Sequence, residues 1–422
     1  MVGVSTDGAS DMTGCRMGTV TRLQQQCHAP IVRIWCGAHQ LDLVVKKALN
    51  SIMEDSFIDT LTGMTGYLRR QKNLIEEMKS TCPTFAATRW ISMGRVLKWF
   101  RVHRERLVEY FNEKHPRCTP TDEWWVVASV LQTFVERIER TFYNIQGTKL
   151  LMSEQKQELD LLVDSILQRT HIEGPLNLRQ RMENIDKLKE DPNYGFSSSD
   201  GSYFVQSKDI KNCIDEVGGY ASLETDFLQE SDDPDDWETY LRILETLSEF
   251  AFDIIQGTRN IASERDSRGG PANEEIPPVL PIDLSQMDVR DFRKELAKNK
   301  TRLENHFASG ANVILMIEEE FRKLREDYRD NKTFRSSLEA AASNVKKQSF
   351  EEAWKPATGF PTLKMYCGCL ASVMPGTSSV EADFSIIHWT KDPNTSSLTD
   401  FSLESILHCK QHKRLKMMCQ ME

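Results

Sequence analysis

VSTDGASDMTG, residues 4–14, joins a short β-branched run to an acidic residue that glycine follows at once. The run is typical of a strand, and Gly8 marks a turn directly after Asp7. An aspartate in this position has two interpretations. It begins the helix that follows, or it is a carboxylate that holds a catalytic metal ion.

The residues after this turn continue an alternation of helix and strand. DMTGCRMGTVTRLQQQC predicts a helix that Gly14 and Gly18 weaken. APIVRIWC, residues 29–36, predicts a second strand, and its successive apolar positions indicate burial on both faces. AHQLDLVVKKALNSIM, residues 38–53, has the apolar spacing of a helix. Short links between these elements predict a parallel pair of strands.

From residue 51 onward the pattern becomes helical. Apolar residues recur at helical spacing in four stretches, exemplified by Leu131 to Ile145, Leu159 to Leu167, Leu244 to Ile254 and Ile314 to Tyr328. These stripes predict a packed helical core. Two polar stretches, the acidic 191–236 and the Pro/Gly-rich 264–286, predict mobile loops because they offer little apolar surface to bury.

Charge is distributed unevenly along the 422 residues, whose net charge is −10. Residues 1–150 hold 20 basic and 15 acidic side chains, whereas residues 151–250 hold 9 basic and 23 acidic ones. The mildly basic first third is suited to a polyanion, although its excess is small. No run of 18 apolar residues predicts a membrane span, and ten scattered cysteines are typical of reduced thiols inside a cell rather than of a disulfide framework.

Four blocks of the chain resemble, in order, those of the hAT superfamily of DNA transposases. TDGASDM resembles the block of the second catalytic aspartate, WCGAHQLDLVV the Cys-x-x-His block, TRWIS the Arg-Trp block, and PGTSSVEADFS the block of the catalytic glutamate. The matching positions are Asp7, Cys36, His39, Arg89, Trp90 and Glu381. The blocks bracket nearly the whole chain, and their order is more specific than any one of them.

The resemblance implies a fold of class α/β plus all-α, in which a large helical insertion interrupts a ribonuclease-H-like domain. Residues 1–50 would form the first part of a partial ribonuclease-H-like domain and 51–354 the mainly helical insertion. Residues 355–422 would supply the last part, with the helix of the catalytic glutamate and a hAT-type dimerisation region. This agrees with the change from β-branched runs to helical stripes.

The resemblance also implies chemistry. Such enzymes cut and join DNA with two divalent metal ions, held about 3.5–4 Å apart by three carboxylates. Asp7 and Glu381 would be two of the three, with Mg²⁺ or Mn²⁺ as the cofactor. Arg89 and Trp90 would contact DNA, with the indole stacking on an extruded base. The alternative is an ordinary buried Trp90 with Arg89 reaching from apolar surface to solvent.

Two departures from the family pattern change the expected activity. Only six residues precede Asp7, so the first family aspartate has no counterpart, and the chain is expected to begin inside a catalytic domain, as an N-terminally truncated form. Ala382 stands where the family usually has arginine. We therefore expect a transposase-derived, DNA-binding chain that is inactive by itself. The alternative is a domesticated interaction and dimerisation protein without enzymatic activity.

Cysteine and histidine residues also raise the question of zinc. Cys36 and His39 lack a second pair at zinc spacing, so they are expected to pack the junction of strand and helix as a structural motif. Another set, near the end of the chain, lacks partners at fixed spacing and is expected to lie on the surface: Cys367, Cys369, His408, Cys409 and His412.

The end of the chain predicts self-association. Four apolar residues crowd one short predicted helix after the glutamate block: Phe401, Leu403, Ile406 and Leu407. The expected partners are therefore DNA and a second copy of the chain, with no membrane. An intracellular location is expected, and the resemblance favours the nucleus.

Overall fold

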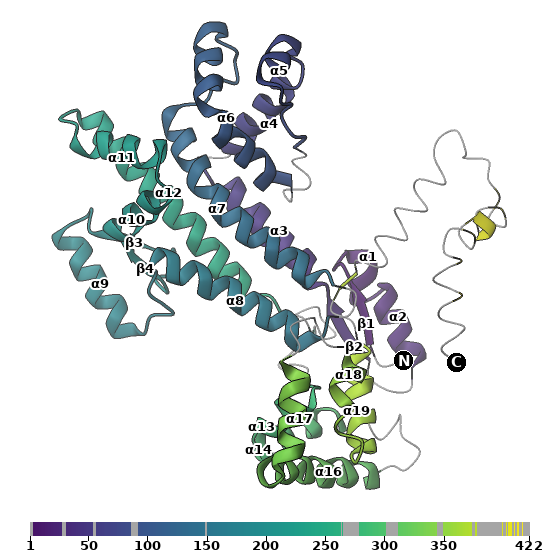
Figure 1. Cartoon of the computed structure of the whole chain (residues 1–422). Coiled ribbons are helices and arrows are strands. Elements are labelled where there is room, and N and C mark those ends of the chain that lie inside the picture. The colour runs from purple at the N-terminus through teal and green to yellow at the C-terminus, as the bar shows by residue number, and fades with distance from the viewer. Residues whose placement is uncertain are drawn as a thin grey trace. The chain divides into compact units, whose positions relative to one another are not determined.

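The computed structural model describes residues 3–27, 31–53, 56–85, 92–147, 150–262, 264, 278–300, 311–343, 349–373 and 376–377, with single positions at 399, 402, 404–406, 409, 412 and 416. Helices dominate these residues, and the described strands form two small two-stranded sheets (Figure 1). The predicted combination of helical regions with a small sheet is confirmed at this level. None of the described helices combines the length and the apolar character needed to span a bilayer.

The first sheet is the predicted parallel pair. Strand β1 (Gly3–Thr6) pairs with β2 (Val32–Trp35), and Thr6 lies opposite Trp35 at the carboxyl ends. Val32 and Ile34 are buried against Val373, whereas the alternate residues of β2 are half-buried. The expectation that β2 is buried on both faces is therefore corrected, because among the described residues only one face meets an apolar layer.

Two helices connect these strands in place of the single predicted one. Helix α1 (Ser10–Thr13) ends before Gly14, and α2 (Thr19–Gln26) begins after Gly18. A Cβ atom at Gly18 would lie 2.5 Å from the backbone nitrogen of Gly14, so the chain passes itself closely between the two helices. The glycines that weaken the predicted helix thus divide it.

The chain divides into two compact units, each made of segments far apart in sequence. Unit 1 comprises residues 1–36, 146–152 and 263–422, and unit 2 comprises 37–145 and 153–262. These bounds differ from the predicted segments 1–50, 51–354 and 355–422. The first helix after β2 groups with unit 2, and the helices after residue 278 group with the strands of unit 1.

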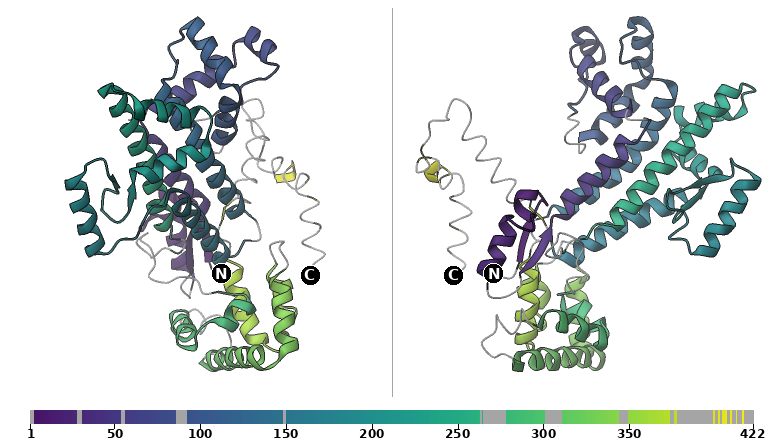
Figure 2. Two further views of the ribbon diagram at one scale, coloured as in Figure 1. Left: turned by 60° about the vertical axis from the view of Figure 1, so that its left-hand side comes forward. Right: turned by 180° about the vertical axis from the view of Figure 1, so that it is seen from behind.

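Unit 2 is a helical assembly built around three long helices that run alongside one another (Figures 1 and 2). They are α3 (Gly37–Asn50), α7 (Asp122–Ile145) and α12 (Pro234–Arg259). Further helices of this unit are α4 (Ser56–Leu68), α5 (Lys72–Met78), α6 (Met93–Lys114), α8 (Met152–Thr170) and α9 (Leu178–Glu190). The predicted apolar stripes of α7 and α12 are buried, which confirms the helical core.

The acidic stretch 191–236 is ordered, so its prediction as a mobile loop is wrong. It contains the hairpin of β3 (Gly195–Ser197) and β4 (Phe204–Gln206), followed by α10 (Ser207–Val217) and α11 (Tyr220–Glu230). A narrow, mainly apolar stripe on each helix is buried, made of Ile210, Cys213 and Ile214 on α10 and of Ala221, Thr225 and Leu228 on α11. Burial of these stripes offsets the conformational entropy that is lost when the stretch becomes ordered, a cost that the polar composition alone predicted to be too large.

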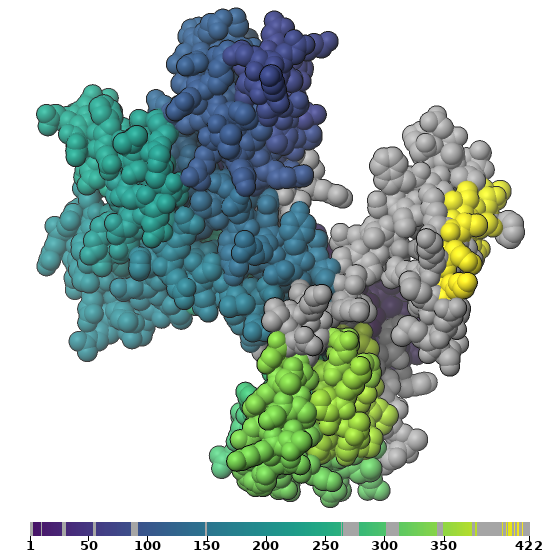
Figure 3. Space-filling view, viewed as in Figure 1, coloured from purple at the N-terminus to yellow at the C-terminus, as the bar shows by residue number. Residues whose placement is uncertain are grey.

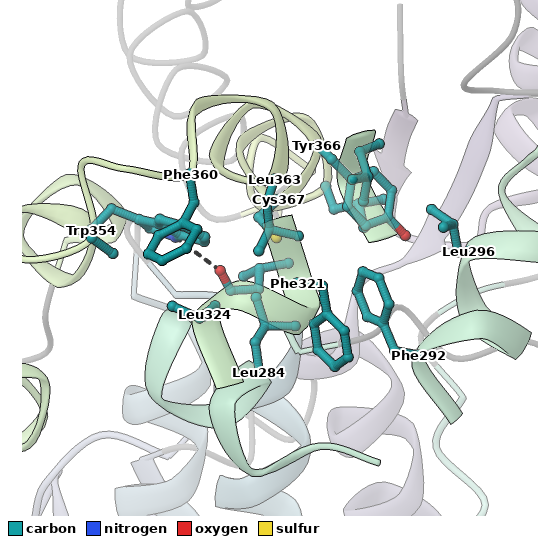
Figure 4. Packing of buried hydrophobic residues seen from close by; sticks show 14 of the residues in the cluster. Leu284, Phe292, Leu296, Phe321, Leu324, Trp354, Phe360, Leu363, Tyr366 and Cys367 are labelled. Carbon is teal, nitrogen blue, oxygen red and sulfur yellow. Dashed lines mark hydrogen bonds between the residues drawn. The ribbon is translucent and has the colours of Figure 1, made fainter. Parts of the chain in front are cut away.

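The helices of unit 1 surround a separate apolar core. They are α13 (Pro281–Gln286), α14 (Val289–Lys298), α16 (Ala311–Asp330), α17 (Lys332–Ala342), α18 (Phe350–Trp354) and α19 (Pro361–Ala371). Cys367 is fully buried in this core, so the prediction that Cys367 lies on the surface is wrong. Phe292 and Phe321 stack with ring centroids 3.8 Å apart, and the indole of Trp354 donates to the carbonyl of Val279 (Figure 4). Helix α13 lies within the predicted loop 264–286, so that prediction is wrong for residues 281–286.

Candidate functional site at the carboxyl ends of β1 and β2

The parallel register brings the ends of β1 and β2 to one edge of the sheet. Asp7 directly follows β1, and Cys36 directly follows β2. The backbone N–H of Cys36 donates to the carbonyl of Thr6 at 2.8 Å, which extends the pairing by one residue. The structure therefore places two of the predicted site residues, Asp7 and Cys36, after neighbouring strand ends.

The side chain of Asp7 shapes the turn that starts α1. Its Oδ1 accepts the backbone N–H of Ala9 at 3.0 Å, the geometry by which aspartate initiates a turn. The hydroxyl of Thr13 donates to the carbonyls of Gly8 and Ala9, which closes the turn from the other side. Asp7 therefore forms a turn between β1 and α1, and it is not the residue that begins α1, since that helix starts at Ser10 after Ala9. The carboxylate remains exposed to solvent, so the turn leaves it accessible.

Trp35, which the sequence pattern predicts only as part of a strand, belongs to this site. Its indole Nε1–H donates to the backbone carbonyl of Asp7 at 2.7 Å and so ties the end of β2 to the turn after β1. Gly8 has φ +83°, and a Cβ atom there would lie 1.8 Å from the Nε1 atom of Trp35. The Asp-Gly pair after a strand was the available signal for such a close approach.

Cys36 and His39 have different surroundings. Cys36 is a buried free thiol in unit 1, which agrees with the predicted packing role. His39 is half-buried in the first turn of α3, which belongs to unit 2. Within the described part of the chain, no three His, Cys, Asp or Glu side chains are grouped so that they can share a metal ion.

The other predicted site residues, Arg89, Trp90 and Glu381, lie outside the described residues. The same holds for Phe401, Leu403 and Leu407 of the predicted self-association region, whereas Ile406 is described and helical. Among the described residues, Asp7 follows β1 at this edge, and Glu264 pairs with Ile34 of β2 through an isolated bridge. Two carboxylates do not fit a two-metal centre, which needs about three, so we derive no metal-dependent step from this edge.

A shallow hollow beside α1 and α2 adds positive charge to the same part of unit 1. Its volume is about 480 Å³, and its lining includes Arg16, Arg22 and the acidic Asp11. Two guanidinium groups against one carboxylate give this hollow a small positive excess. Such an excess is suited to contact with a phosphate, although not to tight binding.

Comparison with the models of known protein families finds no match to this chain.

Proposed function

We propose that the chain is a nucleic-acid-binding protein derived from a hAT-type DNA transposase, and that β1 and β2 belong to a ribonuclease-H-like domain. The observation that carries this proposal is the position of Asp7. It follows β1 at the edge of a parallel pair where the Cys36 motif follows β2. In open sheets with parallel strands, ligands and reacting groups gather outside the carboxyl ends of the strands.

The packing of the sheet also supports this proposal. Val373, which follows α19, is buried against Val32 and Ile34 of β2. A Cβ atom at Gly3 of β1 would lie 2.8 Å from the Cγ1 of the same valine. The chain thus returns to the strand pair after a separation of more than 300 positions, as a domain interrupted by a long insertion would require.

We propose binding without cleavage as the activity of these 422 residues. The motif matches supply two carboxylates, Asp7 and Glu381, for a centre that needs about three. In a relative with the complete set, Mg²⁺ or Mn²⁺ would be held there. DNA is the proposed ligand, and we therefore propose the nucleus as the location.

The first test measures cleavage. We expect no nicking of a terminal-repeat DNA duplex by the purified chain with Mg²⁺ or Mn²⁺. Asp7→Asn keeps an oxygen that can accept from Ala9 and preserves the turn, whereas Asp7→Ala removes it. Metal-dependent nicking that both Asp7→Asn and Glu381→Ala abolish would show that the chain is an active nuclease and would overturn the proposed lack of cleavage.

The second test measures binding. We expect weak association with DNA whose affinity falls steeply between 50 and 200 mM salt, because counterion release drives it. Arg89→Ala and Trp90→Ala should each weaken binding by about fivefold or more, consistent with loss of a phosphate contact or a stacked base. Arg179→Ala is the matched control, since this exposed arginine lies on α9 in the acidic half of the chain. Equal effects of all three changes would contradict a DNA site at Arg89 and Trp90.

A second candidate is a non-enzymatic protein that acts through association with itself. Large apolar side chains on α11 are exposed, Leu223 at 70% and Phe227 at 62%. Such surfaces on a protein of this size are typical of interaction sites. We propose self-association through the C-terminal region, and light scattering at tens of micromolar, about the range of a modest specific interface, tests it. A strict monomer would remove this candidate.

A further inference from the structure

Helix α11 presents an outward face that combines apolar and acidic side chains. Its inner face is buried through Ala221, Thr225 and Leu228. Leu223 and Phe227 lie on the opposite side, four residues apart, and are 70% and 62% exposed. Figure 3 shows the teal surface of this helix at an outer edge of unit 2. Two large apolar side chains on one turn of a helix are more than a folded surface needs.

Acidic residues at helical spacing complete this face. Asp226 and Glu230 are exposed and stand three and seven positions after Leu223; the carboxylate of Asp226 pairs with Lys211 at 2.6 Å, so Glu230 supplies the unbalanced charge of this pair. The whole stretch 212–241 contains ten aspartate or glutamate residues and no lysine, arginine or histidine. We call the set Leu223, Asp226, Phe227 and Glu230 the α11 face.

The charge of the α11 face restricts what can cover it. Nucleic acids and anionic lipid surfaces carry the same sign of charge as this stretch, so electrostatic repulsion opposes their approach. A protein segment with basic and apolar residues on one side has the complementary chemistry. Amphipathic helices bind in this way, through anchors spaced at i, i+3, i+4 and i+7.

The chain itself contains a segment with this chemistry. Residues 405–421 hold four lysine or arginine residues, two histidines and no acid. Leu403, Ile406 and Leu407 precede Lys410 and Arg414 at the spacing i, i+3, i+4, i+7 and i+11. At helical spacing, these apolar and basic residues share one side, as the apolar and acidic residues of the α11 face do.

We propose that the α11 face binds residues 401–420 of a second copy of this chain. The inference rests on the proposed self-association and names the surface that receives the C-terminal segment. Because each copy carries both the face and the segment, two copies related by a two-fold axis form the contact twice. The reciprocal arrangement doubles the buried area and closes the assembly as a dimer.

Carbodiimide crosslinking of the full chain tests this contact. The reagent joins lysine amines to nearby carboxylates, so we expect crosslinks from Lys410, Lys413 or Lys416 to acidic residues within 224–238. A mixture of ¹⁴N- and ¹⁵N-labelled protein identifies crosslinks between copies by their mixed isotope pairs. The Lys364–Glu351 ion pair, with a 2.7 Å separation, is an internal positive control within one copy.

Variants separate a specific contact from general charge attraction. We expect Phe227→Arg to reduce the mixed-isotope crosslinks by about fivefold or more. Leu178→Arg is the matched control, since Leu178 is 77% exposed on α9 of the same unit, and it should leave them unchanged. Glu230→Arg and Arg414→Glu should each lower the yield of mixed-isotope crosslinks, and the double variant should restore it. These substitutions leave the crosslinking lysines unchanged.

Each result has a defined meaning. Mixed-isotope crosslinks that occur elsewhere while light scattering shows a dimer would overturn the α11 site and leave self-association standing. Crosslinks at the predicted positions but only within one copy would overturn docking between copies. An equal loss with Leu178→Arg, or no rescue by the double swap, would also overturn it. A strict monomer would remove both this inference and the self-association on which it rests.

Discussion

The carboxylate of Asp200 accepts four hydrogen bonds in the turn between β3 and β4. The backbone N–H and the hydroxyl of Ser202 donate at 2.9 and 2.7 Å, and Ser198 Oγ and Gln256 Nε2 each donate at 2.8 Å. The bonds from Ser202, backbone first, lower the pKa of Asp200 to about 2 from its usual value near 3.8. Since Gln256 lies on α12, the acidic stretch is tied to the core by a charge rather than only by apolar contact.

The pH dependence of stability should reveal this carboxylate. A lowered folded-state pKa gives stability that is complete above about pH 4 and is lost as pH falls through about 2. Because the residue is exposed, we expect Asp200→Asn to cost only about 1 kcal/mol at pH 7. The difference in the free energy of unfolding between Asp200→Asn and the native chain, measured by urea unfolding, should shrink between pH 4 and pH 2.

A matched control for that series is Asp186→Asn, whose only described contact is an exposed ion pair with Lys189. It should change stability by less than about 0.5 kcal/mol throughout. A difference between Asp200→Asn and the native chain that stayed constant down to pH 2 would show that lost geometry, not lost charge, is responsible.

Gly8 is the second position where one residue sets local structure. Gly8→Ala should destabilise unit 1 by about 1–3 kcal/mol, because φ +83° is strained for alanine and the new methyl group meets Trp35. Thermal unfolding measures the effect. In Gly66→Ala, the added methyl group has no heavy atom within 4 Å and lies inside α4, so it should be neutral or stabilise by about 0.5–1 kcal/mol. Similar losses in both variants would contradict a specific requirement at Gly8.

At the scale of elements, the packing of α3 against α12 in unit 2 depends on a glycine. A Cβ atom at Gly257 of α12 would lie 2.4 Å from the Cγ1 of Val44 on α3. These two long helices can therefore approach more closely than an ordinary side chain at this position allows. The sequence pattern predicts both helices, but it contains no sign that this glycine faces this valine more than 200 positions earlier.

A double-mutant cycle tests the approach of α3 and α12. Gly257→Ala should cost about 1–3 kcal/mol through overpacking, and Val44→Ala about 1 kcal/mol through lost burial. The double variant should be less destabilised than the sum by about 1 kcal/mol, because removing the valine methyl groups makes room for the new one. Strict additivity in urea unfolding would exclude this contact as the reason for the glycine.

At the scale of the whole molecule, the two units have separate apolar cores. The core of unit 1 is centred on Phe321, Phe292 and their neighbours on α13 to α19, whereas that of unit 2 lies between α3, α7 and α12. Cores of this kind define separate cooperative units in unfolding. Each unit also contains segments far apart in sequence, so neither can form from one continuous stretch of chain.

Calorimetry should therefore show two transitions. Phe321→Ala removes a fully buried ring from unit 1 and should lower the free energy of unfolding of that unit by about 3–5 kcal/mol. The transition temperature of unit 1 should fall accordingly. Gly257→Ala should lower the transition temperature of unit 2 alone. A single transition that both variants shift would show that the chain unfolds as one cooperative body, and would remove the division into independent units.

The sequence by itself determines the local elements, because the spacing of apolar residues and the positions of glycine act over a few residues. It predicts the parallel strands, the long helices and the turn at Asp7 in this way. Only the tertiary structure decides which of these elements meet. Residues 191–236 look like a loop by composition, yet they are ordered because their narrow apolar stripes find partners on distant helices, and the same packing leaves Leu223 and Phe227 on the surface. Burial is a property of contacts between residues far apart in the chain, and no local pattern contains it.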